Sequence, residues 1–163
     1  MRSPDRPPTI YRAETLRAEE SLGYLTKRAM ASILLQVDRR LAEHDLTHAQ
    51  WLPLYKLSMG QCSTMAGLAR DVSMDPGAMT RALDRLEAKG LVRRVRSQED
   101  RRVINLELTD EGREASKLVP AVLADVYNAH LAGFTRAEWN TLIELLQRLV
   151  ANGDAMRDAR EAE

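Results

Sequence analysis

Apolar residues recur every three or four positions over several stretches of this chain, with polar residues between them. The first such stretch covers residues 18–41, and its spacing predicts a long amphipathic helix. A second helix is predicted to begin at Thr47, because Thr47 and Gln50 have the spacing of a capping box, and to end at Gly60. Two further stretches of the same period in the last third of the chain predict two more long helices.

Between these long helices lie two short amphipathic segments. The first follows Thr64, and the second begins at Asp75 and Pro76, where the aspartate can cap a helix and the proline suits its first position. The second segment is predicted to end at Gly90, because glycine readily adopts the left-handed conformation that terminates a helix. Two short helices a few residues apart, the second well capped, are typical of a helix-turn-helix.

The period of the pattern changes after the second short helix. Residues 91–96 and 103–108 are expected to be extended, and apolar and polar residues alternate in the second of them as in a half-buried strand. The intervening residues 97–102 are all polar. This pattern predicts a two-stranded hairpin with a charged tip, which is the wing of a winged helix.

Together these elements predict a mainly α protein, an α+β winged helix with six helices and a two-stranded β-hairpin. Residues 47–109 form the predicted winged helix-turn-helix lobe. Residues 17–46 and 110–152 form a helical dimerisation region, residues 1–16 a disordered lead, and residues 153–163 a frayed tail.

Composition excludes several classes of protein. The chain has 44% hydrophobic residues, enough for a core, and no apolar stretch long enough to span a membrane. Its single cysteine, Cys62, cannot form an intrachain disulfide; it is expected to be inert and fits a cytoplasmic location. No nucleophile elbow, phosphate-binding loop, metal-ligand cluster or carboxylate pair stands out, so we expect no enzyme, no cofactor and no metal site.

The formal net charge of zero conceals an uneven distribution. Residues 76–102 contain eight basic and four acidic residues, so this segment carries +4 and the rest of the chain −4. The positive charge therefore falls on the second short helix and the hairpin. Such a concentration is the electrostatic mark of a surface that binds nucleic acid.

Two motifs carry a resemblance to a known family. Residues 79–93 resemble the recognition helix of the MarR family as it runs into the first wing strand. Asp100 and Arg102, followed after five residues by Leu108 and Thr109, are similar to the D-x-R-x5-L-T wing signature of that family. The resemblance covers nearly the whole chain. It implies a transcriptional regulator, most often a repressor, that binds a palindromic operator in double-stranded DNA as an intertwined homodimer.

Three polar residues of the second short helix are candidates for DNA contact. Thr80, Arg81 and Arg85 share one exposed helical face, and the first turns of a recognition helix enter the major groove. Arginine can pair with guanine or hold a phosphate group. The alternative is a solvated helix face on which Arg81, Asp84 and Arg85 form ion pairs with one another.

The wing tip supplies three further candidates on the strength of the resemblance. It implies that Arg102 inserts into the minor groove, where the negative potential is enhanced, and that Asp100 orients its guanidinium group. Arg101 between them is expected to contact phosphate. The alternative is an ordinary charged hairpin tip without a role in binding.

The long helices hold more apolar residues than the winged lobe requires, and these need a surface to pack against: Leu22, Leu25, Trp139, Leu142, Leu146 and Leu149. A single winged lobe also offers few contacts to DNA. The resemblance implies that the terminal helices of two chains intertwine to form the dimer. The alternative is that these helices close a larger core within one chain.

The resemblance also implies release from DNA by a small aromatic acid or phenol bound between the dimer helices and the lobe. Arg28 and Ser32 could bind the carboxylate and hydroxyl groups, with Trp51 and Tyr55 as flat apolar walls. The alternative for these four residues is a structural role, with Trp51 and Tyr55 in the core and Arg28 on the surface. A winged-helix module that binds proteins and senses no ligand is the competing function.

Overall fold

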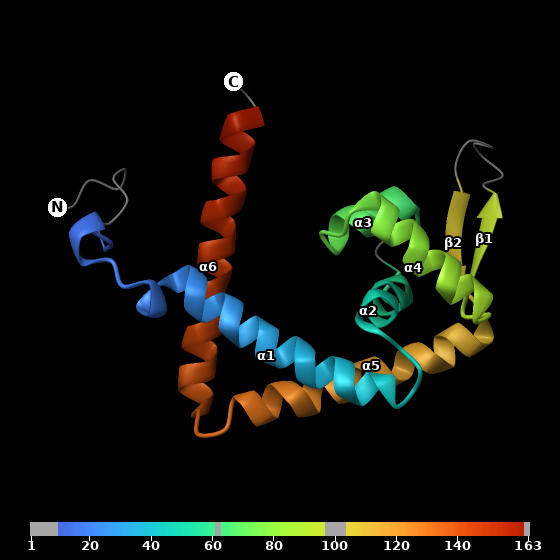
Figure 1. Ribbon diagram of the computed structural model, residues 1–163, viewed down its shortest axis with the longest axis horizontal. Coiled ribbons are helices and arrows are strands. Elements are labelled where there is room, and N and C mark those ends of the chain that lie inside the picture. Colours follow the sequence, from blue (N-terminus) through green and yellow to red (C-terminus); the bar gives the residue numbers. More distant parts are fainter. Residues whose placement is uncertain (1–9, 61–62, 97–103, 162–163) are drawn as a thin grey trace. The chain divides into compact units, whose positions relative to one another are not determined.

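The computed structural model describes residues 10–60, 63–96 and 104–161 of the 163-residue chain. These residues form six α-helices and one two-stranded sheet, as the sequence predicts (Figure 1). In chain order the elements are α1 Leu22–Ala42, α2 His48–Ser58, α3 Met65–Asp71, α4 Pro76–Ala88, β1 Val92–Arg96, β2 Ile104–Leu108, α5 Asp110–His130 and α6 Arg136–Glu161. None of the helices in the described ranges is long and apolar enough to cross a membrane.

The chain divides into two compact units, Met1–Ala124 and Asp125–Glu163. The first unit holds α1 to α4, the hairpin and most of α5. The second holds the last turns of α5 and the whole of α6.

Capping residues determine where α1, α2 and α4 begin. α1 begins at Leu22, later than predicted, because the Ser21 hydroxyl accepts a hydrogen bond from the Tyr24 backbone N–H at 3.3 Å. α2 begins with the predicted capping box of Thr47 and Gln50. At α4 the Asp75 carboxylate accepts the N–H of Ala78 at 3.0 Å, and proline occupies the first helical position, as the sequence predicts.

Both ends of the chain contain more regular structure than the sequence pattern indicates. Within the predicted disordered lead, Ala13–Thr15 forms a 3-10 turn, while residues 1–9 lie outside the described part. The predicted frayed tail is helical as far as Glu161, because α6 continues through it. This extension has Met156 as its one large apolar residue but is rich in good helix formers, and Arg157 pairs with Asp154 one turn earlier.

The wing is an antiparallel hairpin with the predicted strands. Val92 lies opposite Leu108 and Arg96 lies opposite Ile104. The turn from α4 into β1 is made by Gly90, whose φ of +70° is the left-handed conformation expected for a glycine that ends a helix. β2 also has a second partner beside β1, because the Leu106 backbone N–H donates to the carbonyl of Ser63 at 2.6 Å.

The core of the first unit lies between α2, α4 and the hairpin. The inward face of α4 packs against α2 and α3, and β1–β2 lies beside the C-terminal end of α4 (Figure 1). The largest fully buried side chains include Leu41, Leu46, Leu54, Leu68, Met79, Leu83 and Leu86. Each such side chain stabilises the fold by about 1.5–3 kcal/mol before the entropy of ordering is deducted. This packing sets the direction in which the opposite face of α4 points.

Candidate nucleic-acid interface

The outer face of α4 carries two arginines that are available to a ligand. Arg81 and Arg85 are exposed, whereas the residues that turn inward are buried: Met79, Ala82, Leu83 and Leu86. Neither arginine belongs to an ion pair within the described part of the chain. Both guanidinium groups can therefore meet phosphate or base edges without first breaking an internal contact.

Thr80, the third candidate on this helix, is only half exposed. Its hydroxyl donates to the Pro76 carbonyl one turn earlier at 2.9 Å and lies 3.4 Å from the sulfur of Met65 on α3. The hydroxyl proton is thus used inside the protein. The oxygen retains lone pairs that can accept a hydrogen bond.

The acidic residues of α4 are bound by Arg94 of the wing. One guanidinium nitrogen, Nη2, lies 2.6 Å from Asp84 Oδ1, and Nη1 donates to Glu87 Oε2. The backbone N–H of Arg94 also donates to Glu87 Oε1 at 3.3 Å. The alternative in which Asp84 pairs with Arg81 and Arg85 is therefore wrong, because the carboxylate is turned toward β1. The hydrogen bond that Arg94 donates to Asp84 is the largest cause that raises the pKa of Arg94, and partial burial opposes it.

The other arginines of β1 differ from Arg94 and from each other. Arg93 forms a cross-strand ion pair with Glu107, with Nη2 2.7 Å from Oε2. Arg96, the last residue of β1, is exposed and has no ion pair among the described residues. Sequence reasoning counted Arg96 only within the basic segment. The signal that distinguishes it is its place as the last residue of β1, immediately before residues 97–103 that connect the two strands.

Several predicted residues lie outside the described part of the chain. These are the wing-tip candidates Asp100, Arg101 and Arg102, together with Cys62.

Lys89 fastens the C-terminal end of α4 to the turn between α1 and α2. Its ammonium group lies 2.8 Å from Asp45 Oδ2 and 3.3 Å from Gln50 Oε1, and it also donates to the carbonyl of Asp45. Gln50 belongs to the capping box of α2. The contacts of Lys89 therefore limit how far α4 can tilt relative to α2.

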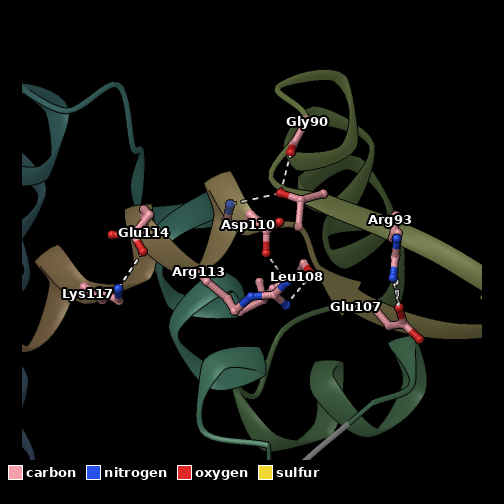
Figure 2. A network of polar contacts seen from close by, with 10 residues as sticks. Gly90, Arg93, Glu107, Leu108, Asp110, Arg113, Glu114 and Lys117 are labelled. Carbon is pink, nitrogen blue, oxygen red and sulfur yellow. Dashed lines mark hydrogen bonds and ion pairs between the residues drawn. The ribbon is translucent and has the colours of Figure 1, made fainter.

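A second set of hydrogen bonds connects the base of the wing to α5. The Thr109 hydroxyl donates to the Gly90 carbonyl at 2.6 Å and accepts the Gly112 N–H at 2.9 Å. Figure 2 shows Arg113 reaching back toward Leu108, whose carbonyl accepts from Nη1 at 2.9 Å. The end of α4, the end of β2 and the start of α5 are thereby joined through backbone groups.

The four predicted effector residues lie on α1 and α2. Trp51 is 3% exposed, and its indole N–H donates to Asp38 Oδ1 at 2.8 Å. Tyr55 is half-buried, whereas Arg28 and Ser32 are exposed on α1. The guanidinium carbon of Arg28 stands 5.7 Å from the centre of the Tyr24 ring, a cation–π distance.

A cavity of about 640 Å³ opens elsewhere in the first unit, between α2, β2 and the first turns of α5. Leu57, Leu106 and Pro120 form apolar parts of its wall, and Arg113 and Lys117 add positive charge. The four predicted effector residues do not line it.

The succession of α3, a short turn, α4 and an antiparallel hairpin defines a winged helix-turn-helix. The sequence profile of the MarR family matches residues 46–104, which cover most of this lobe. The HTH-type transcriptional regulator SarZ of Staphylococcus haemolyticus is 28% identical over 112 residues, which are 69% of this chain and 75% of SarZ.

Solved structures agree with the profile. A Mycobacterium tuberculosis MarR family protein, determined in complex with salicylic acid, is 31% identical, with a TM-score of 0.67; the match covers 82% of this chain and 99% of that one. A mutant MarR from E. coli, determined in complex with operator DNA, is 29% identical with a TM-score of 0.71, covering 78% and 92%. This chain belongs to the MarR family, a family of transcriptional regulators and not of enzymes.

Proposed function

We propose that this protein is a sequence-specific DNA-binding regulator, acting in the cytoplasm as a repressor, in which α4 reads the major groove of a palindromic operator. The observation that carries the proposal is the outer face of α4, where Arg81 and Arg85 are exposed and unpaired among the described residues. The related E. coli MarR was determined with operator DNA. Thr80 belongs to the same contact surface as an acceptor.

The wing completes the proposed contact. Arg102 enters the minor groove, Asp100 holds its guanidinium group, and Arg101 contacts phosphate, in keeping with the family resemblance. The exposed Arg96, the last residue of β1 before the connecting residues 97–103, adds a further positive charge next to the tip.

The protein acts as a homodimer in this proposal. Large apolar side chains remain exposed on α6, among them Leu142, Leu145, Leu146 and Leu149, which are 36–47% exposed. Exposed apolar surface of this kind marks an interface. α1 carries a similar group, including Leu22, Leu25 and Met30. A second copy that covers these helices places two lobes for the two halves of a palindrome.

The salt dependence of DNA binding tests the proposal. Six phosphate contacts made by a dimer would give a slope of about −5 in log K against log salt, because bound arginines release counterions. The full chain is titrated into a duplex from the promoter region of its own gene and into a scrambled duplex, at several salt concentrations. A flat response would contradict DNA binding, and equal affinity for both duplexes would contradict sequence specificity. A flat response would favour the protein-interaction module, whereas equal affinity would indicate nonspecific DNA binding.

The proposed effector is a small aromatic acid, the chemical class of the salicylic acid found in the M. tuberculosis relative. We place its carboxylate beside Lys117 in the cavity, because within the described residues the ammonium group of Lys117 is balanced by no more than an exposed ion pair with Glu114. The alternative location is the one predicted from the sequence, with Arg28 and Ser32 of α1 and Trp51 and Tyr55 of α2. It is less suited, because the indole of Trp51 is buried and already bonded to Asp38.

Thermal shift with salicylate separates the two locations. Saturating salicylate at about 100 times its Kd should stabilise the wild-type protein by about 2.7 kcal/mol and release it from the operator duplex. Lys117→Met should weaken this response, whereas Arg28→Met should leave it unchanged. If Arg28→Met weakened the response and Lys117→Met did not, the result would support the alternative location on α1 and α2. No stabilisation of the wild-type protein by salicylate or by other aromatic acids would contradict ligand sensing.

A further inference from the structure

A recognition helix that approaches DNA with carboxylates on its surface faces a repulsive contribution. Asp84 and Glu87 lie one turn apart on α4, the helix proposed to meet the phosphates. Two unopposed negative charges there would lower the affinity for any DNA sequence, since like charges at close range oppose association. A positive group that does not itself contact DNA is therefore needed to balance the charge of these two carboxylates.

Arg94 meets this requirement in its contacts. Its two terminal nitrogens are divided between the two carboxylates, Nη2 on Asp84 at 2.6 Å and Nη1 on Glu87. Its backbone N–H adds a third bond to Glu87 at 3.3 Å. A planar guanidinium that binds two acids in this way has a fixed orientation, which a lysine in its place could not reproduce.

The burial of Arg94 distinguishes it from the arginine beside it. The side chain of Arg94 is 29% exposed, against 65% for Arg93, which pairs across the hairpin with Glu107. Arg94 also stands within β1, opposite Leu106, so its contacts join the first wing strand to the C-terminal half of α4. The basic segment of the sequence thus contains an arginine whose partners are acids of the same lobe.

We infer that Arg94 is a positioning residue for DNA recognition: it neutralises Asp84 and Glu87 on the recognition helix and sets the angle between that helix and the wing, without contacting DNA itself. This inference rests on the proposed DNA-binding function. It separates Arg94, which acts through α4, from the arginines of the basic segment that are proposed to contact DNA.

Affinity for operator and scrambled duplexes tests this role in the full chain. Arg94→Met should lose about tenfold or more in operator affinity, because two carboxylates then face the DNA unbalanced. The triple variant Asp84→Asn, Glu87→Gln, Arg94→Met should return to within about threefold of the wild-type operator affinity, because the carboxylates that Arg94 balances are gone. Its ratio of operator to scrambled affinity should stay lowered, because the wing is not held in this variant either. A triple variant as weak as Arg94→Met would overturn the inference, and so would an Arg94→Met variant that binds like the wild-type protein.

A matched variant controls for the simple addition of positive charge. Asp71→Asn and Glu107→Gln, added to Arg94→Met, remove two acids of the same lobe that pair with Lys56 and Arg93. This variant has the same net charge as the first triple variant but leaves Asp84 and Glu87 ionised. It should stay about as weak as Arg94→Met. Recovery equal to that of the first triple variant would overturn the inference.

A variant that retains Arg94 keeps the test decisive if Arg94→Met fails to fold. In Asp84→Asn, Glu87→Gln the affinity for scrambled DNA should rise, while the ratio of operator to scrambled affinity should fall at least threefold, because the wing is no longer held. An unchanged ratio would overturn the role of Arg94. If the wild-type protein bound neither duplex, the proposed function would fail and this inference with it. Operator binding by the wild-type protein with contrary variant behaviour would reject only the inference.

Discussion

Arginines a few positions apart in this chain have different environments, and their partners determine what each can do. Arg81 and Arg85 project from α4 without an ion pair among the described residues. Arg93 and Arg94 follow a few residues later, yet both are paired with carboxylates of the same lobe. A positive charge already balanced at short range contributes less to a distant phosphate. The net charge of the basic segment therefore overstates the number of groups available to DNA.

At the scale of single residues, the arginines proposed to touch DNA should be separable from arginines elsewhere. Arg81→Ala should cost about 1–3 kcal/mol in operator binding and relax sequence preference, if its guanidinium pairs with a base edge. Arg102→Ala should weaken operator binding strongly without lowering the melting temperature. Fluorescence anisotropy with operator and scrambled duplexes, alongside thermal melts, measures both effects.

Arg157→Ala serves as the control for these two variants. Arg157 lies near the end of α6, where it pairs with Asp154 on the same helix. Its loss should alter neither affinity nor sequence preference. Unchanged affinity in Arg102→Ala would refute the role assigned to the wing tip, and the same loss in all three variants would indicate a nonspecific charge effect.

At the scale of elements, most boundaries follow from local chemistry. The capping box of Thr47 and Gln50, the cap at Asp75 and the left-handed Gly90 each act within one turn of their own helix. Such capping signals can be recognised in the sequence, because the groups that interact are only three or four residues apart. The late start of α1 is also a local effect, since Ser21 provides the cap. The contact between α5 and the wing is of a different kind, because its partners are distant in sequence.

Gly112 shows how closely α5 approaches the wing. A methyl group on Gly112 would overlap the carbonyl oxygen of Leu91 at the entry to β1, and a backbone atom cannot give way as the end of a side chain can. Gly112→Ala should therefore destabilise the protein by about 1–3 kcal/mol, the usual cost of overpacking. Urea unfolding followed by circular dichroism measures it.

Gly153→Ala is the matched control. Gly153 lies within α6, and a methyl group there would meet nothing within 4 Å. Alanine should stabilise that helix by up to about 1 kcal/mol, because it has the better helix propensity. Equal effects of the two substitutions would contradict the close contact between α5 and Leu91.

At the scale of the whole molecule, the winged lobe and the second compact unit differ in how their apolar residues are buried. The lobe buries its large side chains within itself, including Leu54, Met79 and Leu83. α6 has Leu145 at 47% and Leu149 at 40% exposure. A helix with this much exposed apolar surface gains stability from a partner, which accords with the proposed homodimer.

Disruption of α6 should abolish dimer formation and operator binding together. Leu142→Glu with Leu149→Glu places two charges on the apolar face of α6, and burying them in an interface would be costly. Sedimentation velocity at micromolar concentration should show a monomer, and operator affinity should fall toward that for scrambled DNA. Gln147→Glu, on an already polar position of the same helix, should remain dimeric. A double variant that stays dimeric and binds the operator would refute the proposed interface.

The sequence by itself determined the type and order of the elements, the winged helix-turn-helix and the family. It also identified Arg81 and Arg85 as outward-facing, because residues on one helix are placed by their spacing alone. Only the tertiary structure decided that Asp84 turns to Arg94, ten residues away, and that Trp51 is buried against Asp38. Those partners belong to different elements. The packing of α4 against β1 brings Asp84 to Arg94, and the packing of α1 against α2 brings Asp38 to Trp51. Periodicity shows on which face of its own helix or strand a residue lies. Which residue it contacts there depends on which other element packs against that face, and this is decided by the tertiary structure.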